Sequence, residues 1–193
     1  AFNLAAMGRH DEALAEIHVA QELDPRSLII NTAVANILYY ARRYDEAIEQ
    51  CQRTLEMDPG FVPAYMVLRG AYVSAGMVKE ADDVFQKEES YAGNDPGKLA
   101  RLAHLQAAGG KRDEALKTLD ELRKLRRRQP LFAYEIAAAY SLLKETDEAF
   151  AWLARAEVEH SIGFAFIKVD PDLDSLRPDP RFNALLERIK LSK

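Results

Sequence analysis

Asp45-Glu46-Ala47-Ile48 is the stretch of sequence that decides the fold, because copies of it return at a fixed interval. The copies are Asp11-Glu12-Ala13-Leu14, Asp113-Glu114-Ala115-Leu116, Asp147-Glu148-Ala149-Phe150 and the divergent Lys79-Glu80-Ala81-Asp82. The alanines stand at 13, 47, 81, 115 and 149, so each follows the last by 34 residues. A fixed period of about 20 to 50 residues is typical of stacked supersecondary units. The sequence predicts a helical repeat array.

Each of these stretches marks the expected start of a helix. Acidic residues before an apolar pattern of helical spacing favour a helix N-terminus, because free backbone N–H groups and the macrodipole attract negative charge. Proline disfavours helix in the residue before it, so Pro25 and Pro59 predict helix ends. Another helix is expected upstream of each later alanine, over 30–40, 64–74, 99–108 and 132–143. Glycines 8, 76, 109 and 110 are expected at the turns between the two helices of a unit.

The repeat resembles the tetratricopeptide repeat, a helix-turn-helix unit whose length, about 34 residues, matches the interval between the alanines. The second copy is the most similar, with Val34, Ala35, Leu38, Tyr44, Ala47, Cys51 and Pro59 at the family's positions. Arg69 and Glu88 stand where the family has small residues, which predicts looser or rotated packing after the third unit. The resemblance implies an all-α fold, a right-handed α-α superhelix (solenoid) of about five units plus a C-terminal capping helix.

The register divides the chain into expected units. They cover about 1–27, 28–61, 62–95, 96–129 and 130–160, followed by a cap with an Asp/Pro-rich linker over 161–193, all in one continuous domain. Counting back one period from Leu38 reaches Leu4, so we expect the chain to begin mid-unit, as a fragment of a longer protein. A short helix is expected over 162–169, then an irregular linker. An amphipathic helix over 181–191, with Phe182, Leu185, Leu186 and Ile189 on one face, is expected to cap the array.

Composition excludes some functions. No stretch of the 193 residues approaches the roughly 20 apolar residues of a membrane span. The single cysteine, Cys51, lies at an apolar helix position and is expected to be buried and unreactive, and the lack of a disulfide framework predicts a cytoplasmic location. The net charge of −5 argues against nucleic acid as the main partner. We interpret the basic residues at 123, 124 and 126–128 as a solvated helix end, with a phosphate-binding patch as the alternative.

The sequence contains no recognisable catalytic, cofactor-binding or metal-binding motif, so we expect neither an enzyme nor a cofactor. The four histidines have no metal-ligand spacing. Asp170, Asp172 and Asp174 copy the first three ligand positions of a calcium loop, but Ser175 replaces the required glycine and Arg181 the required glutamate. We therefore interpret the three aspartates as turn-forming and capping residues.

The resemblance also implies where a partner binds, because in the family the first helices of the units line a groove. The recurring groove positions contain the candidate residues Thr32, Asn36, Tyr39, Met66, Arg101, His104 and Tyr134. In the family, a clamp of lysines, arginine and asparagines binds the C-terminal carboxylate of chaperone tails. Only Asn36 and Arg101 match this clamp here, so a chaperone tail is disfavoured as the ligand. Tyr39, Tyr134 and Arg101 are of the types that most often carry binding energy. The alternative is that the tyrosines pack against the next unit and that His104 is a core-edge residue.

These observations predict a non-catalytic interaction scaffold that binds a peptide or helix of a partner protein. Residues 173–182, Leu-Asp-Ser-Leu-Arg-Pro-Asp-Pro-Arg-Phe, also resemble the closing segment of prokaryotic proteins whose repeat array follows a winged-helix, cyclase or kinase domain. The alternative is therefore a regulatory or sensing domain of a larger transcriptional or signalling protein. It would act by docking on its own effector domain or by self-association, and the second mode would produce a homo-oligomer.

Overall fold

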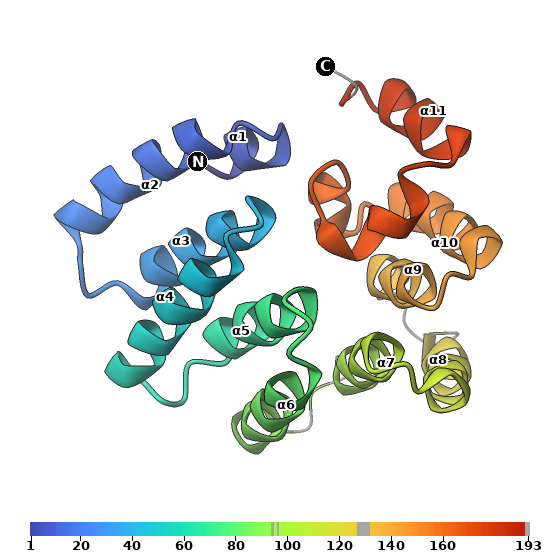
Figure 1. Ribbon diagram of the computed structural model, residues 1–193, viewed down its shortest axis with the longest axis horizontal. Helices are drawn as coiled ribbons and strands as arrows, with labels where there is room; N and C mark the ends of the chain where they lie inside the picture. The colour runs from blue at the N-terminus through green and yellow to red at the C-terminus, as the bar shows by residue number, and fades with distance from the viewer. Residues whose placement is uncertain (94, 96, 127–131, 192–193) are drawn as a thin grey trace. The chain divides into compact units, whose positions relative to one another are not determined.

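A computed structural model describes residues 1–93, 95, 97–126 and 132–191, and every regular element in these ranges is helical (Figure 1). The chain divides into two compact units, Ala1–Asn94 and Asp95–Lys193. The predicted all-α repeat fold is confirmed. The limits of the individual repeats and the single continuous domain stay predictions. No helix in the described part of the chain has both the length and the apolar character that a membrane span requires.

The first unit consists of three helix pairs. Its helices are α1 (Phe2–Ala6), α2 (His10–Leu23), α3 (Leu28–Tyr40), α4 (Tyr44–Met57), α5 (Val62–Ser74) and α6 (Val78–Ala92). Each first helix packs against the second helix of its own pair, and α4 also packs against α5. The first helices α3 and α5 are in contact as well.

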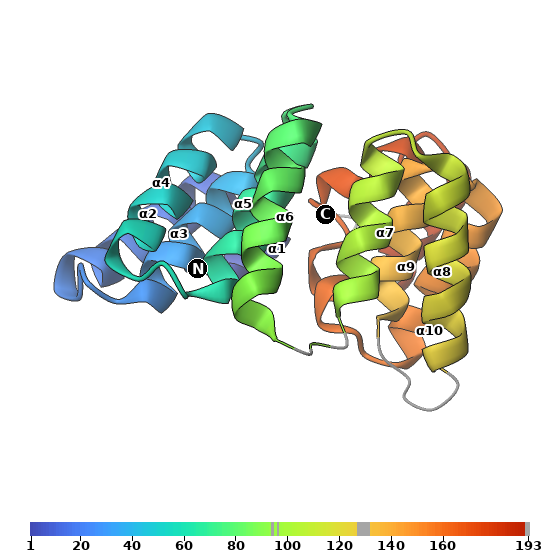
Figure 2. The ribbon, with the colours of Figure 1, turned by 90° about the horizontal axis from the view of Figure 1, so that it is seen from below.

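The second unit contains two helix pairs and a C-terminal segment. Its elements are α7 (Lys98–Ala108), α8 (Arg112–Arg126), α9 (Ala133–Leu142), α10 (Thr146–Val158), the 3-10 helices η1 (Ile162–Phe166) and η2 (Pro171–Leu176), and α11 (Pro180–Arg188). The first helices α7 and α9 pack against one another, and α9 also contacts both 3-10 helices. Figure 2 shows α7, α8 and α9 side by side in this unit.

The period seen in the sequence is present in the backbone. The second helix of each pair begins at 10, 44, 78, 112 and 146, the same interval that separates the recurring alanines. The turn before each of them contains a residue of positive φ, at Gly8, Arg42, Gly76, Gly110 and Lys144. The four predicted turn glycines lie at turns, and Gly8, Gly76 and Gly110 have positive φ. Arg42 and Lys144 adopt the same left-handed conformation, which is unfavourable for residues other than glycine.

The recurring alanines are packing residues. Ala13, Ala47, Ala81, Ala115 and Ala149 are all 0% exposed, so each lets two helices approach closely. A larger side chain at these positions would push the two helices apart, because protein interiors are close-packed. One apolar core lies in each unit. Cys51 belongs to the first core as predicted, and burial raises the pKa of its thiol to about 12.

The two unusual residues of the third repeat compensate one another. Arg69 on α5 and Glu88 on α6 form an ion pair with Nε and Oε2 3.2 Å apart, and both side chains are buried. A buried charge is tolerated when it is paired and hydrogen-bonded. Each residue therefore makes the other one acceptable inside the α5–α6 pair.

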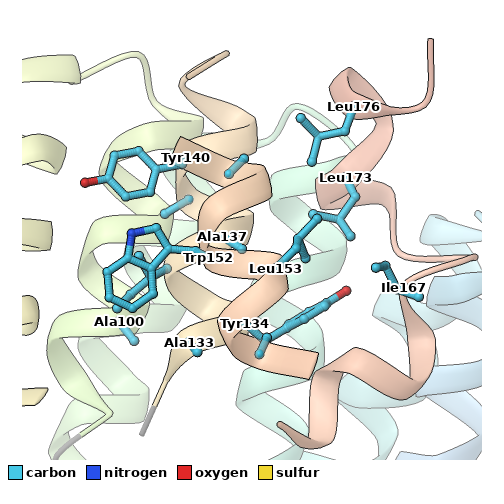
Figure 3. Close-up of a cluster of buried hydrophobic side chains, with 14 of the residues drawn as sticks. Ala100, Ala133, Tyr134, Ala137, Tyr140, Trp152, Leu153, Ile167, Leu173 and Leu176 are labelled. Carbon is cyan, nitrogen blue, oxygen red and sulfur yellow. The ribbon is translucent and has the colours of Figure 1, made fainter. Parts of the chain in front are cut away.

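The C-terminal segment differs from its predicted form. The helix expected over 162–169 is the short 3-10 helix η1, and the expected irregular linker contains η2. The final helix is present, with Phe182, Leu185 and Leu186 buried as predicted. Ile167, Leu173 and Leu176 are each 0% exposed, and Figure 3 shows them in one cluster with Tyr134. The segment between α10 and α11 is therefore part of the core of the second unit and not a connecting linker.

Candidate partner-binding face

The seven candidate residues fall on first helices, as the register predicts. Four belong to the first unit, Thr32, Asn36 and Tyr39 on α3 and Met66 on α5. Three belong to the second unit, Arg101 and His104 on α7 and Tyr134 on α9. Their role in binding stays a prediction. The structure shows what each set contacts within its own unit.

We call the first set of positions the α3–α5 face. By helical spacing it contains Ile29, Thr32, Ala33, Asn36 and Tyr39 of α3 and Pro63, Met66, Val67, Gly70 and Val73 of α5. The corresponding positions two repeats later form the α7–α9 face. They are Ala100, Arg101, His104 and Ala107 of α7 and Tyr134, Glu135, Ala138 and Ser141 of α9.

The α7–α9 face is covered by residues 162–177 of the same chain, which we call the docked tail. Nε2 of His104 lies 2.7 Å from Oδ2 of Asp172. The hydroxyl group of Tyr134 donates to Oδ2 of Asp170 at 2.6 Å. At the other end of α9, the hydroxyl group of Ser175 donates to the backbone oxygen of Ser141 at 2.7 Å. Two of the candidate residues are thus bound to the docked tail.

The backbone of the docked tail also lies directly on the ring of Tyr134. A Cβ atom built on Gly163 would be 2.4 Å from Cδ1 of Tyr134 and 2.9 Å from its Cγ. Such distances are far below van der Waals contact, and the ring cannot move aside as the end of a flexible chain could. The contact requires glycine at position 163.

Asp170 is the most perturbed carboxyl group of this contact. Burial and the neighbouring charge of Asp172 raise its pKa from 3.8 to about 7, against the opposing effects of the Tyr134 hydroxyl group, the Asp172 backbone N–H and His104. The N–H of Asp172 donates to Oδ1 of Asp170, which caps η2. The guanidinium group of Arg177 donates to the backbone oxygens of Lys168 and Asp170. The predicted capping role is confirmed for Asp170, and no cluster of three or more potential metal ligands occurs among the residues that the structure describes.

Arg101 is held at the start of α7. Its guanidinium group pairs with the carboxylate of Asp95, which also accepts the backbone N–H of Gly97. These bonds hold the pKa of Asp95 low although burial opposes them. The Arg101 side chain is 7% exposed. Its contact with Asp95 therefore orders the N-terminus of α7.

The α3–α5 face has no such cover within its own unit. Ile29 is 75% exposed and Met66 is 47% exposed. On the same face, Oγ1 of Thr32 and Oδ1 of Asn36 are buried without a hydrogen-bond partner among the described residues. Buried polar atoms of this kind are rare in native proteins and call for an explanation.

Tyr39 lies at the end of this face beside Gly70. A Cβ atom on Gly70 would be 3.6 Å from the Tyr39 ring, which is ordinary contact. Tyr39 also contacts the rings of Tyr40 and Tyr44. Its ring is therefore packed against its own unit, with 9% of the residue exposed.

The two faces differ in charge. The ten positions of the α3–α5 face contain no Asp, Glu, Lys, Arg or His, whereas the α7–α9 face contains Arg101, His104 and Glu135. Parts of the predicted basic end of α8 lie outside the described residues, namely Arg127, Arg128 and the side chain of Arg126. The described site is thus an uncharged, partly exposed surface across two neighbouring first helices.

No family model matches the sequence. No curated protein matches it significantly. Among solved structures, YrrB, described as a TPR protein with an unusual peptide-binding site, is 18% identical over 89% of this chain and 97% of its own, with a TM-score of 0.49. MamA MSR-1 C2 is 19% identical over 81% of this chain and 90% of its own, also with a TM-score of 0.49.

The deciding observation is in the chain itself, where helix starts, left-handed turns and buried alanines all recur at one and the same interval. The helix pairs have the length and the helix-turn-helix form that tetratricopeptide repeats have. The sequence did not predict the pairing of Asp170 and Asp172 with Tyr134 and His104. The available signal was two aspartates beside Leu173 and Leu176, since apolar residues in a supposed linker indicate that it packs.

Proposed function

We propose that the α3–α5 face binds a peptide segment of a partner protein, and that the chain acts as an interaction scaffold without catalysing a reaction. The observation that carries the proposal is the exposure of the apolar side chains Ile29 and Met66 on a face that also contains the hydrogen-bonding residues Thr32 and Asn36. Apolar contacts supply binding energy, and buried hydrogen-bonding groups fix the register of the ligand.

The proposal assigns partner binding to one of the two equivalent faces. His104 and Tyr134 are engaged by the docked tail, so an external peptide would have to displace Leu173 and Leu176 to reach them. Two fully buried leucines oppose that displacement by roughly 3 kcal/mol or more. The α3–α5 face has no docked tail in its own unit.

The test compares two pairs of exposed apolar side chains on the full chain. One variant carries Ile29→Ala and Met66→Ala on the α3–α5 face. The matched control carries Val19→Ala and Leu23→Ala on α2, where the two residues are 58% and 83% exposed. Proteins captured from a cell lysate by the wild-type chain are identified, purified and titrated against all three chains by calorimetry.

We expect the face variant to lose affinity by about tenfold or more, because contacts at the centre of an interface dominate its energy. The control should bind like the wild type. Equal binding by the face variant would contradict the proposal. Capture of a second copy of this chain through the same residues would replace a foreign partner with self-association.

A further inference from the structure

The α3–α5 face and the α7–α9 face are copies of one another at a distance of two repeats. Asn36 precedes His104 by two periods, and Met66 precedes Tyr134 by the same distance along the chain. All four residues lie on first helices. Because the docked tail covers the second copy, the molecule itself shows how a peptide segment lies across two neighbouring first helices of this chain.

The docked tail uses three kinds of contact on the α7–α9 face. Its carboxylates meet the imidazole of His104 and the hydroxyl group of Tyr134. Its apolar side chains, Leu173 among them, are buried in the core. Its backbone at Gly163 lies on an aromatic ring. These contacts come from two short 3-10 helices of five and six residues and from Asp170, the N-cap of the second, not from a long α-helix.

The α3–α5 face cannot make the first kind of contact. Asn36 carries no charge, and Met66 has no hydroxyl group to donate. A carboxylate over these two residues would lose its hydration without gaining a cationic partner, and it could not satisfy Oδ1 of Asn36, which only accepts hydrogen bonds. The amide of Asn36 can instead donate to and accept from a neutral group. The Thr32 hydroxyl, on a residue only 8% exposed, is likewise without a partner among the described residues.

We infer that the ligand of the α3–α5 face is a neutral counterpart of the docked tail: a short, turning, mainly apolar peptide of a partner protein. It places an uncharged hydrogen-bonding group at Asn36 and an apolar side chain at Met66. The inference rests on the proposed function and adds the chemistry of the ligand to it. Charge complementarity supports this occupant, because the face contains no ionisable residue.

The experiment selects random linear peptides, displayed on phage, against the immobilised full chain. The best peptide is synthesised, together with a version that carries Asp at the position contacting Asn36, as located by an aspartate scan. Both peptides are titrated against the wild-type chain, against Met66→Ala and against the double variant Asn36→His, Met66→Tyr, which copies the α7–α9 face. Val19→Ala is the matched control, and Asn36→His alone serves if circular dichroism shows that the double variant is unfolded.

The wild-type chain should prefer the neutral peptide by about tenfold or more, since its face offers the carboxylate no cationic partner. The double variant should reduce or reverse this preference. Two results would overturn the inference and leave the proposed function standing. One is that the peptides depend on Met66 for binding yet carry Asp or Glu at the position contacting Asn36, and the other is an unchanged preference in the double variant. No enrichment, or peptides that bind Met66→Ala as tightly as the wild type, would overturn the proposed function and the inference with it.

Discussion

The α3–α5 face and the α7–α9 face begin with the same repeat geometry and end in different states. On α7 and α9, His104 and Tyr134 bind aspartates of the docked tail. On α3 and α5, the corresponding Asn36 and Met66 contact no such segment within their unit, and Met66 is 47% exposed. The backbone repeat therefore supplies two equivalent faces. In the second unit a few side chains bind the chain's own tail, and we propose that a partner covers the face of the first unit.

The largest difference between the two faces is expected when a core side chain of the docked tail is removed. Leu173→Ala should destabilise the second unit by about 2–5 kcal/mol, because it leaves a cavity in a fully buried site. Met66→Ala, on the open face, should change stability by no more than about 0.5 kcal/mol. Circular dichroism during urea unfolding measures both variants. The fluorescence of Trp152, the single tryptophan, reports the second unit alone, because this residue lies in that unit's core. Equal effects of the two substitutions would contradict the difference between the faces.

A second difference between the two faces is the pH dependence that Asp170 gives to the docked tail. The folded pKa of Asp170, about 7, exceeds its ordinary value of 3.8, because the carboxyl group is buried. Between these values the folded state keeps a proton that the unfolded state releases, so this group makes the second unit less stable as pH rises from about 4 to 7. The loss approaches about 1.4 kcal/mol per pH unit at most.

Asp170→Asn removes this titration while its amide oxygen can still accept a hydrogen bond from Tyr134. We expect the stability of Asp170→Asn relative to the wild type, followed by Trp152 fluorescence, to improve as pH rises from 4 to 7 and then to level off. A difference that does not change with pH would show that Asp170 is ionised throughout this range.

A third and smaller difference between the two faces is expected for a matched pair of glycine substitutions. Gly163→Ala should destabilise the second unit by about 1–3 kcal/mol, because the new methyl group overlaps the Tyr134 ring. Gly70→Ala adds a methyl group at ordinary contact distance from Tyr39 within α5 and should be neutral or stabilising by up to about 1 kcal/mol. Circular dichroism melting curves check both variants. Destabilisation by Gly70→Ala as large as that by Gly163→Ala would mean that both faces are equally closed.

Most of the repeat fold could be predicted from the sequence because its signals are local. The acidic first turns and the small buried alanine recur at one interval, and they predicted where the second helix of each pair begins. The left-handed turns at Arg42 and Lys144 were not predicted, since no glycine marks them. Arg69 and Glu88 were interpreted separately as departures, because nothing in the sequence shows that these two distant residues pair inside one helix pair.

The candidate site was harder to predict because it depends on contacts outside the period. His104 and Asp172 are 68 residues apart in sequence, and no repeat rule relates a first helix to a 3-10 helix in the tail. The register correctly placed the face positions on first helices. It could not show that the chain itself covers one of the two faces.

Hydroxyl-radical footprinting of the wild-type chain, with and without a peptide selected on it, tests the central claim most directly. Met57 and Met66 are 43% and 47% exposed, and Tyr91 and Tyr134 are 50% and 5% exposed, so each candidate has a reference of its own type. We predict that Met66 oxidises like Met57 in the free chain and that the peptide protects Met66 alone, while Tyr134 is protected relative to Tyr91 throughout. Protection of Met66 without peptide, or peptide-dependent protection at Tyr134 in place of Met66, would contradict the assignment of an open and a closed face.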